Sequence, residues 1–265
     1  MSNFDIIDLS ASEKNLKGEI LKSLKKIEDF QKYFDELAKY IFGHVGIVIG
    51  DSSSKQIKYY LEEIEFYYNN SIIEEEEITY TSKDKKEKKE KKEKKNYFSC
   101  TYKRKRDAEQ LFWHYSGVDI CFQSDENCYG GILIRSLIKE YNDQNGNPVR
   151  ELIAGPLRCA NDIINQCIEN KINTIPRVDK VERYDDEYLK KLRSTIRQGI
   201  ETSEKYSDII SNIEKDSKRY VKSKDFPFPF FNYYIERGDD WKTIVDDKKI
   251  PYSANPEKRE VIRMV

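Results

Sequence analysis

The segment 56–68, QIKYYLEEIEFYY, constrains the fold more than any other stretch of the sequence. It follows HVGIVIG and the turn-like tetrad DSSS, so Val45–Ile49 and 56–68 are predicted to pair as an antiparallel hairpin. Residues two apart on a strand lie on the same face of a sheet. One face of this strand is therefore predicted to carry two acids together with aromatic rings: Tyr59, Leu61, Glu63, Glu65 and Tyr67.

The other segments predict a mixture of helices and strands. Before the hairpin, a capping box at Ser10 and Glu13 and apolar residues at helical spacing predict two helices, or one bent helix, ahead of Gly43. After it, three strands are expected in QLFWHYSGVDICFQS, YGGILIRSLIKEY and PVRELIAG, the last two joined by the turn-rich NDQNGN. A closing strand is expected in FPFPFFNYYIERGDDW.

The second half of the chain also predicts helices. GPLRCANDIINQCIE is typical of a helix that begins at Pro156, with Leu157, Ala160 and Ile164 on its apolar face. The polar segment 184–219 predicts a long helix or a helix pair. The expected fold class is therefore α+β: a single mixed domain over residues 1–265, with a curved, mainly antiparallel sheet around a pocket and helices outside.

The composition agrees with one sizeable core. The chain has 265 residues, 38% hydrophobic and 36% charged, which gives it a heavily solvated surface. No stretch approaches the roughly 20 apolar residues that span a bilayer, and residues 1–12 lack the basic start of a signal peptide. We therefore expect an intracellular protein, in the cytoplasm or nucleus, with no membrane partner.

Most metal and cofactor chemistries lack the residues they need in this sequence. The five cysteines are odd in number and form no C-x-x-C pair, so buried, reduced thiols are expected. Only His44 and His114 are available as histidines, and no H-E-x-x-H, P-loop or G-x-G-x-x-G motif occurs. No metal or organic cofactor is expected, and the available chemistry rests on carboxylates, aromatic rings and arginine.

Positive charge is concentrated in one segment. Residues 83–106 hold thirteen Lys or Arg against four Asp or Glu, a local net charge of +9, while the whole chain carries −1. The Lys/Glu-rich part, 83–95, is interpreted as a low-complexity insertion within the domain. The basic tetrad Lys103, Arg104, Lys105 and Arg106 leads into a strand-like run, where its cations could meet phosphates.

Six motifs occur in the order and approximate spacing of a known enzyme family: LAKYIFGHV, EIEFYY, SGVDICF, ILIRSL, GPLRCANDI and YYIERGDDW. In this the chain resembles the alkyladenine (3-methyladenine) DNA glycosylases, from about residue 37 to about 169 and weakly in the closing run. The resemblance implies a monofunctional DNA glycosylase that acts as a monomer on a modified base in DNA. Such an enzyme uses water, needs no cofactor and leaves an abasic site.

The resemblance places the general base on Glu65 and one wall of the base pocket on Tyr67. A carboxylate beside the sugar can stabilise its developing positive charge and deprotonate the attacking water, and an aromatic face restacks an extruded base. Arg135 falls on the family's arginine that binds a backbone phosphate and helps hold acid and water. Without the resemblance, Glu65 would be an exposed acid paired with a lysine such as Lys58. The alternative for Arg135 is an outward-facing strand residue, which is disfavoured because Leu133 and Leu137 share its strand parity and a charged group among apolar neighbours usually has a partner.

The resemblance assigns residues less directly to the opposite pocket wall and to the DNA wedge. The family's second pocket tyrosine aligns with Trp113 if no gap is allowed and with His114 if one residue is deleted. His114 has the alternative role of a buried structural histidine. The tyrosine that fills the gap left by the base falls on Ser116, with Tyr115 the nearest substitute.

Two departures concern the choice of base. The family's pocket histidine falls in the acidic run 74–77, and Gln123 stands where the family has an asparagine that screens purines. We therefore expect weak or no release of 3-methyladenine and hypoxanthine, and release of another modified base. Two alternatives stay open: an N-glycosidic hydrolase acting on RNA or nucleotides, and a nucleic-acid-binding relative without catalysis.

Overall fold

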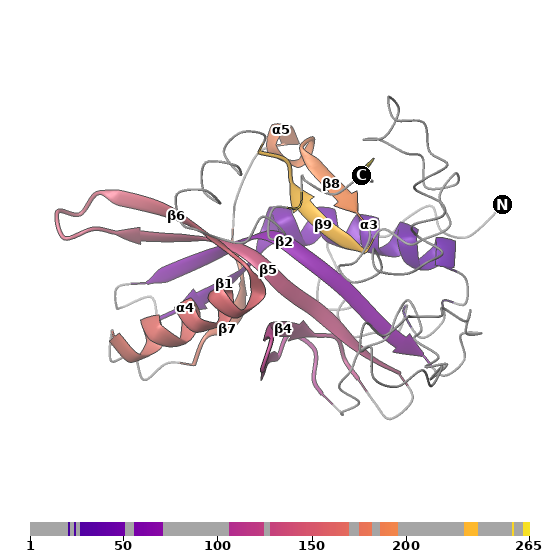
Figure 1. Ribbon diagram of the computed structural model, residues 1–265, viewed down its shortest axis with the longest axis horizontal. Helices are drawn as coiled ribbons and strands as arrows, with labels where there is room; N and C mark the ends of the chain where they lie inside the picture. The colour runs from indigo at the N-terminus through magenta and orange to yellow at the C-terminus, as the bar shows by residue number, and fades with distance from the viewer. Residues whose placement is uncertain are drawn as a thin grey trace, which may run out of the picture.

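The structure is a computed structural model that describes residues 21, 24, 27–50, 56–70, 106–124, 128–169, 175–181, 186–195, 231–237, 256 and 262–265. Helices pack on a curled antiparallel sheet, which is the α+β class predicted from the sequence (Figure 1). The helices are α3 (Ile27–His44), α4 (Pro156–Glu169) and α5 (Asp186–Leu189). The strands are β1 (Val45–Ile49), β2 (Ile57–Asn70), β3 (Leu111–His114), β4 (Gly117–Cys121), β5 (Cys128–Asn142), β6 (Pro148–Ala154), β7 (Arg177–Lys180), β8 (Leu192–Thr195), β9 (Asn232–Ile235) and β10 (Ile262–Met264).

The long strands β2 and β5 lie side by side at the centre of the sheet (Figure 1). The order across the sheet is β10, β8, β9, β2, β5, β4, β3, with β1 on the first part of β2, β7 beyond β1, and β6 on the last part of β5. The predicted hairpin of β1 and β2 is confirmed, with Gly46 opposite Tyr60. Strand β2 therefore pairs with β5 on one edge over most of its length, and with β1 and then β9 on the other edge as far as Glu65.

Helices α3 and α4 cover opposite faces of β2. From α3, the ring of Phe34 stacks on that of Phe66, with centroids 4.5 Å apart. From α4, Asp162 accepts a 2.8 Å hydrogen bond from the hydroxyl of Tyr59. The charge of Glu63 acts on Cys159 of α4, so α4 lies over the face predicted to hold the acids, although the pairing of β2 with β5 is irregular on both sides of Glu63.

The segment around HYSG forms a hairpin rather than the single strand predicted. Strands β3 and β4 pair with each other, and His114 and Gly117 flank a turn at Tyr115 and Ser116. A side chain at position 117 would collide with α4, because an added Cβ would lie 2.9 Å from the Cβ of Pro156. Glycine at the end of the turn thus lets the hairpin pack against the start of the helix.

Two helix predictions are wrong in part. Helix α4 begins at Pro156 as predicted, but it buries Cys159, Ala160 and Ile163, whereas Leu157 and Ile164 are 50% and 41% exposed. Because this helix has apolar residues on more than one side, the face that packs against the sheet is next to the one predicted. In place of the start of the long helix predicted over 184–219, the chain forms the short α5 and the strand β8.

Several predicted features lie outside the described residues. These are the capping box at Ser10 and Glu13, the insertion 83–95, most of the basic tetrad, and Cys100. The prediction of reduced thiols is confirmed for the four other cysteines: Cys121, Cys128 and Cys159 are buried and Cys167 is partly buried, all without disulfides.

Candidate active site

Two buried carboxylates and one arginine form the centre of the candidate site. Arg135 on β5 donates from Nε to Glu63 Oε1 at 2.9 Å and from Nη1 to Glu65 Oε2 at 3.3 Å. Glu63, Glu65 and Arg135 are 1%, 4% and 5% exposed. The interpretations of Glu65 as an exposed acid paired with Lys58, and of Arg135 as an outward-facing residue, are therefore wrong.

Glu63 is held by further donors. Ser136 Oγ donates to its Oε2 at 3.3 Å, and Asn232 Nδ2 donates to its Oε1 at 3.1 Å. The thiol of Cys159 on α4 is also near: burial raises the pKa of Cys159, and the negative charge of Glu63 is the next largest cause. Both oxygens of Glu63 are thus occupied by side chains that fix its position.

A carboxylate on β4, Asp119, joins two rings. The hydroxyl of Tyr67 donates to Asp119 Oδ1 at 2.5 Å, and His114 Nε2 lies 3.0 Å from the same oxygen. The other ring nitrogen of His114, Nδ1, accepts a 3.3 Å hydrogen bond from the backbone N–H of Ser116. Because Nδ1 is the acceptor, the hydrogen-bond network assigns the proton to Nε2, which donates to Asp119.

The pairing of the strands places Tyr67, Asp119 and His114 beside the two acids. Glu65 of β2 pairs with Leu133 of β5, and Leu133 pairs with Asp119 of β4. Directly paired residues point to the same side of a sheet, and neighbouring strands are about 4.8 Å apart. The backbones at Glu65 and Asp119 are therefore about 10 Å apart on one face.

The structure distinguishes the two candidates for the second pocket wall. Trp113 packs against the hydrophobic core. His114 points to the other side, where its side chain is 5% exposed and contacts Asp119. Of the two alternatives left open by the sequence, His114 is the ring that lies on the Tyr67 side of the sheet.

The turn between β3 and β4 presents a large aromatic side chain to solvent. Tyr115 is 84% exposed, whereas the hydroxyl of Ser116 lies 2.9 Å from His114 Nδ1. Nearby, the guanidinium of Arg106 lies 3.3 Å from the ring centroid of Phe112, which pairs with Asp119. One cation of the basic tetrad thus adjoins the aromatic hairpin, while Lys103, Arg104 and Lys105 are outside the described residues.

Gln123 has different neighbours from those expected of a base-screening residue. The backbone N–H of Ala108 donates to its Oε1 at 3.2 Å, and its Nε2 donates to Asp107 Oδ1 at 3.5 Å. These contacts hold the amide against the loop that precedes β3. The structure does not bring the Gln123 amide into contact with Tyr67 or Glu65.

Sequence reasoning missed three polar residues of the site, Asp119, Ser136 and Asn232. A signal existed for Asp119, because a carboxylate inside the apolar run GVDIC needs a partner. Ser136 and Asn232 are uncharged residues in apolar or aromatic runs, and nothing in the sequence relates either of them to Glu63. Their contacts with that acid arise from the pairing of β2 with β5 and β9.

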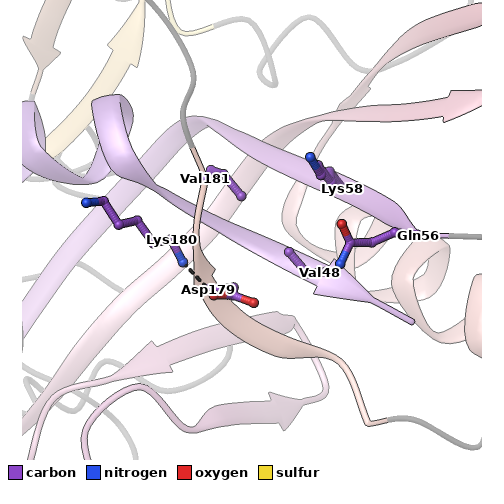
Figure 2. Close-up of a pocket in the computed structure, with 6 residues that line it drawn as sticks. All are labelled: Val48, Gln56, Lys58, Asp179, Lys180 and Val181. Atoms are coloured by element: carbon purple, nitrogen blue, oxygen red, sulfur yellow. Dashed lines mark hydrogen bonds between the residues drawn. The ribbon is translucent and has the colours of Figure 1, made fainter. Parts of the chain in front are cut away.

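A separate pocket of about 560 Å³ lies by β1, β2 and β7 (Figure 2). Lys58 and Gln56 lie at one end of it and Asp179 and Lys180 at the other (Figure 2). Lys58 pairs with Val48, which also lines the pocket. None of the residues that line this pocket belongs to the candidate site, so the two are distinct.

Within the described ranges, no three His, Cys, Asp or Glu side chains converge in a way that could hold a metal ion. None of the helices in the described part of the chain has the length and apolarity needed to cross a membrane. No family model matches the sequence, and no curated protein shows significant similarity to it.

Proposed function

We propose that the protein is a monofunctional DNA glycosylase, which hydrolyses the N-glycosidic bond of a modified base flipped out of DNA. The observation that carries the proposal is the buried acid pair Glu63 and Glu65, bound by the single guanidinium of Arg135. The pair lies on the same face of the sheet as the linked rings of Tyr67 and His114. In this proposal Glu65 activates the attacking water.

The acid pair suits the charge that develops during cleavage of a glycosidic bond. With both acids ionised, the two carboxylates share the positive charge of Arg135. Buried carboxylates need such a partner to be compatible with folding. A sugar that becomes cationic at C1′ is stabilised by the negative charge of the carboxylates, more strongly in a water-poor site than in solvent.

The aromatic groups suit the extrusion of a base. Taking a base out of the stack costs a few kcal/mol, and stacking on an aromatic side chain recovers about 1–3 kcal/mol. Tyr67 and His114 offer rings that Asp119 holds by one oxygen. The exposed Tyr115 is available to occupy the space left in the duplex, and Arg106 adds a cation for the phosphates.

Each group then has one role in the reaction. Glu65 takes a proton from water as the oxygen of that water forms a bond to C1′. The bond between C1′ and the base nitrogen breaks, and its electron pair leaves with the base. Glu63 keeps Arg135 in place, and the products are a free base and an abasic site.

The test is base release from oligonucleotides. Duplexes that each hold one modified base are incubated with the purified protein, and abasic sites are measured as alkali-induced breaks. The wild type should form abasic sites in at least one duplex. Glu65→Gln should form none but should still bind DNA, because the amide keeps the shape of the side chain and cannot take the proton. Glu140→Gln, the same change at an acid bonded to the exposed Arg150, should leave release unchanged.

Other outcomes would lead to different conclusions. Duplex binding without base release by the wild type would contradict the proposal and indicate a nucleic-acid-binding protein without catalysis. Release from RNA or free nucleotides alone would indicate the alternative hydrolase. Equal release by the wild type and Glu65→Gln would remove Glu65 as the base.

A further inference from the structure

Asn232, at the start of β9, carries a buried oxygen that lacks a hydrogen-bond donor. The residue is 0% exposed, and its Nδ2 donates to Glu63 Oε1 at 3.1 Å. Its Oδ1 is buried too, and no donor in the described part of the chain reaches it. An acceptor left in this state costs about 1–3 kcal/mol, so a group other than the described side chains is expected beside it.

Exchanging the oxygen and nitrogen of this amide does not remove the problem. The exchanged amide would place its oxygen 3.1 Å from Glu63 Oε1, so two acceptors would face each other. The pairing with Glu63 therefore determines the orientation, and the missing partner of Asn232 is a donor.

The register of β9 and β2 puts this oxygen next to the proposed base. Asn232 pairs directly with Glu65, so the two side chains lie on the same face of the sheet. The Cβ atoms of such a pair are about 4.5–5.5 Å apart. A single water that makes two hydrogen bonds of about 2.8 Å can bridge oxygens up to about 5.6 Å apart, a separation within reach of two side chains paired in this way.

We infer that Asn232 Oδ1 and Glu65 together hold the water that attacks the sugar, an inference that rests on the proposed function. The water donates one hydrogen to each oxygen, which leaves its lone pairs to face C1′. When the oxygen–C1′ bond forms, Glu65 takes the proton that it already accepts as a hydrogen bond. Asn232 takes no proton and is a positioning residue.

The first experiment is a crystal structure of the full-length wild-type protein at a resolution that shows ordered water. A water is expected within about 2.6–3.2 Å of Asn232 Oδ1 and of one carboxylate oxygen of Glu65. A protein donor on Oδ1, or a site without water, would overturn the inference whatever the activity of the protein.

The second experiment measures which nucleophile reacts. In buffer that contains methanol, base release yields a methyl glycoside beside the abasic site, and the product ratio reports how strictly the site selects water. Asn232→Ala removes the acceptor and leaves room for a larger nucleophile. It should slow single-turnover hydrolysis about 10- to 100-fold and raise the fraction of methyl glycoside.

Ser136→Ala is the matched control, because it also removes a donor to Glu63 but leaves Asn232 Oδ1 in place. Any slowing that it causes should leave the product ratio at the wild-type value. If Asn232→Ala gave the same ratio of methyl glycoside to abasic site as the wild type, the inference would be overturned. If Asn232→Ala does not fold, or if the wild type releases no base and so refutes the proposed function, the crystal structure alone decides whether Asn232 and Glu65 bind a water.

Discussion

Replacing Arg135 with leucine should destabilise the protein by about 3–5 kcal/mol, because it leaves two buried carboxylates without their shared cation. Arg135 lies 2.9 Å from Glu63 and 3.3 Å from Glu65, and its side chain is 6% exposed. Hydrogen bonds to charged groups contribute about 1.5–3 kcal/mol each, so two of them give a similar total. In a chain of this size the loss corresponds to a Tm lower by roughly 6–20 °C.

Arg150 offers a matched control for burial. It also lies on a strand of the sheet and donates from Nε to a glutamate, Glu140, at 2.8 Å, but its side chain is 55% exposed. Exposed ion pairs contribute about 0–1 kcal/mol, so Arg150→Leu should be nearly neutral. Urea unfolding followed by circular dichroism measures both variants. A loss below about 1 kcal/mol in Arg135→Leu would refute the reasoning, as would failure of added Glu63→Gln and Glu65→Gln changes to recover stability.

Four further results are expected. Tyr115→Ala should reduce single-turnover base release from a well-paired site about 10-fold more than from an unpaired one, because only the paired base must be extracted. Asp119→Ala should lower the free energy of unfolding in urea by about 1–3 kcal/mol, because it removes the acceptor shared by two rings. Peptide mapping at pH 8 should find iodoacetamide on the partly buried Cys167 before the fully buried Cys159. Burial raises the pKa of both thiols, and the charge of Glu63 raises that of Cys159 further. Since the folded state holds the thiol proton of Cys159 more tightly than the unfolded state does, the stability of the protein should fall as pH rises above the ordinary cysteine pKa of about 8.5.

The parts of the fold that depend on neighbours in the sequence were predictable. The β1–β2 hairpin follows from strand patterning on both sides of DSSS, and the β5–β6 hairpin from the turn residues of NDQNGN. The start of α4 follows from Pro156, whose ring favours the first turn of a helix. In each of these cases the local sequence pattern favoured one structure over the alternatives.

Predictions failed where several local patterns were compatible with the sequence. The helix α4 has apolar residues on more than one side, and contact with the sheet selects the side of Cys159 and Ile163. The run from Leu111 to Cys121 is strand-like throughout, yet it reverses direction at Tyr115 and Ser116 so that β4 can pair with β5. Neither choice can be made from the segment alone, because the deciding contacts are with other elements.

The sequence by itself determined that Glu63, Glu65 and Tyr67 share a face, because alternation along one strand is a local property of the backbone. Tertiary structure decided that Arg135 binds both acids and that Asp119 and Asn232 stand on either side of Glu65. These contacts depend on the register between strands far apart in the chain. A shift of one residue in any of these pairings would turn the partner side chain to the opposite face, and no single segment encodes that register.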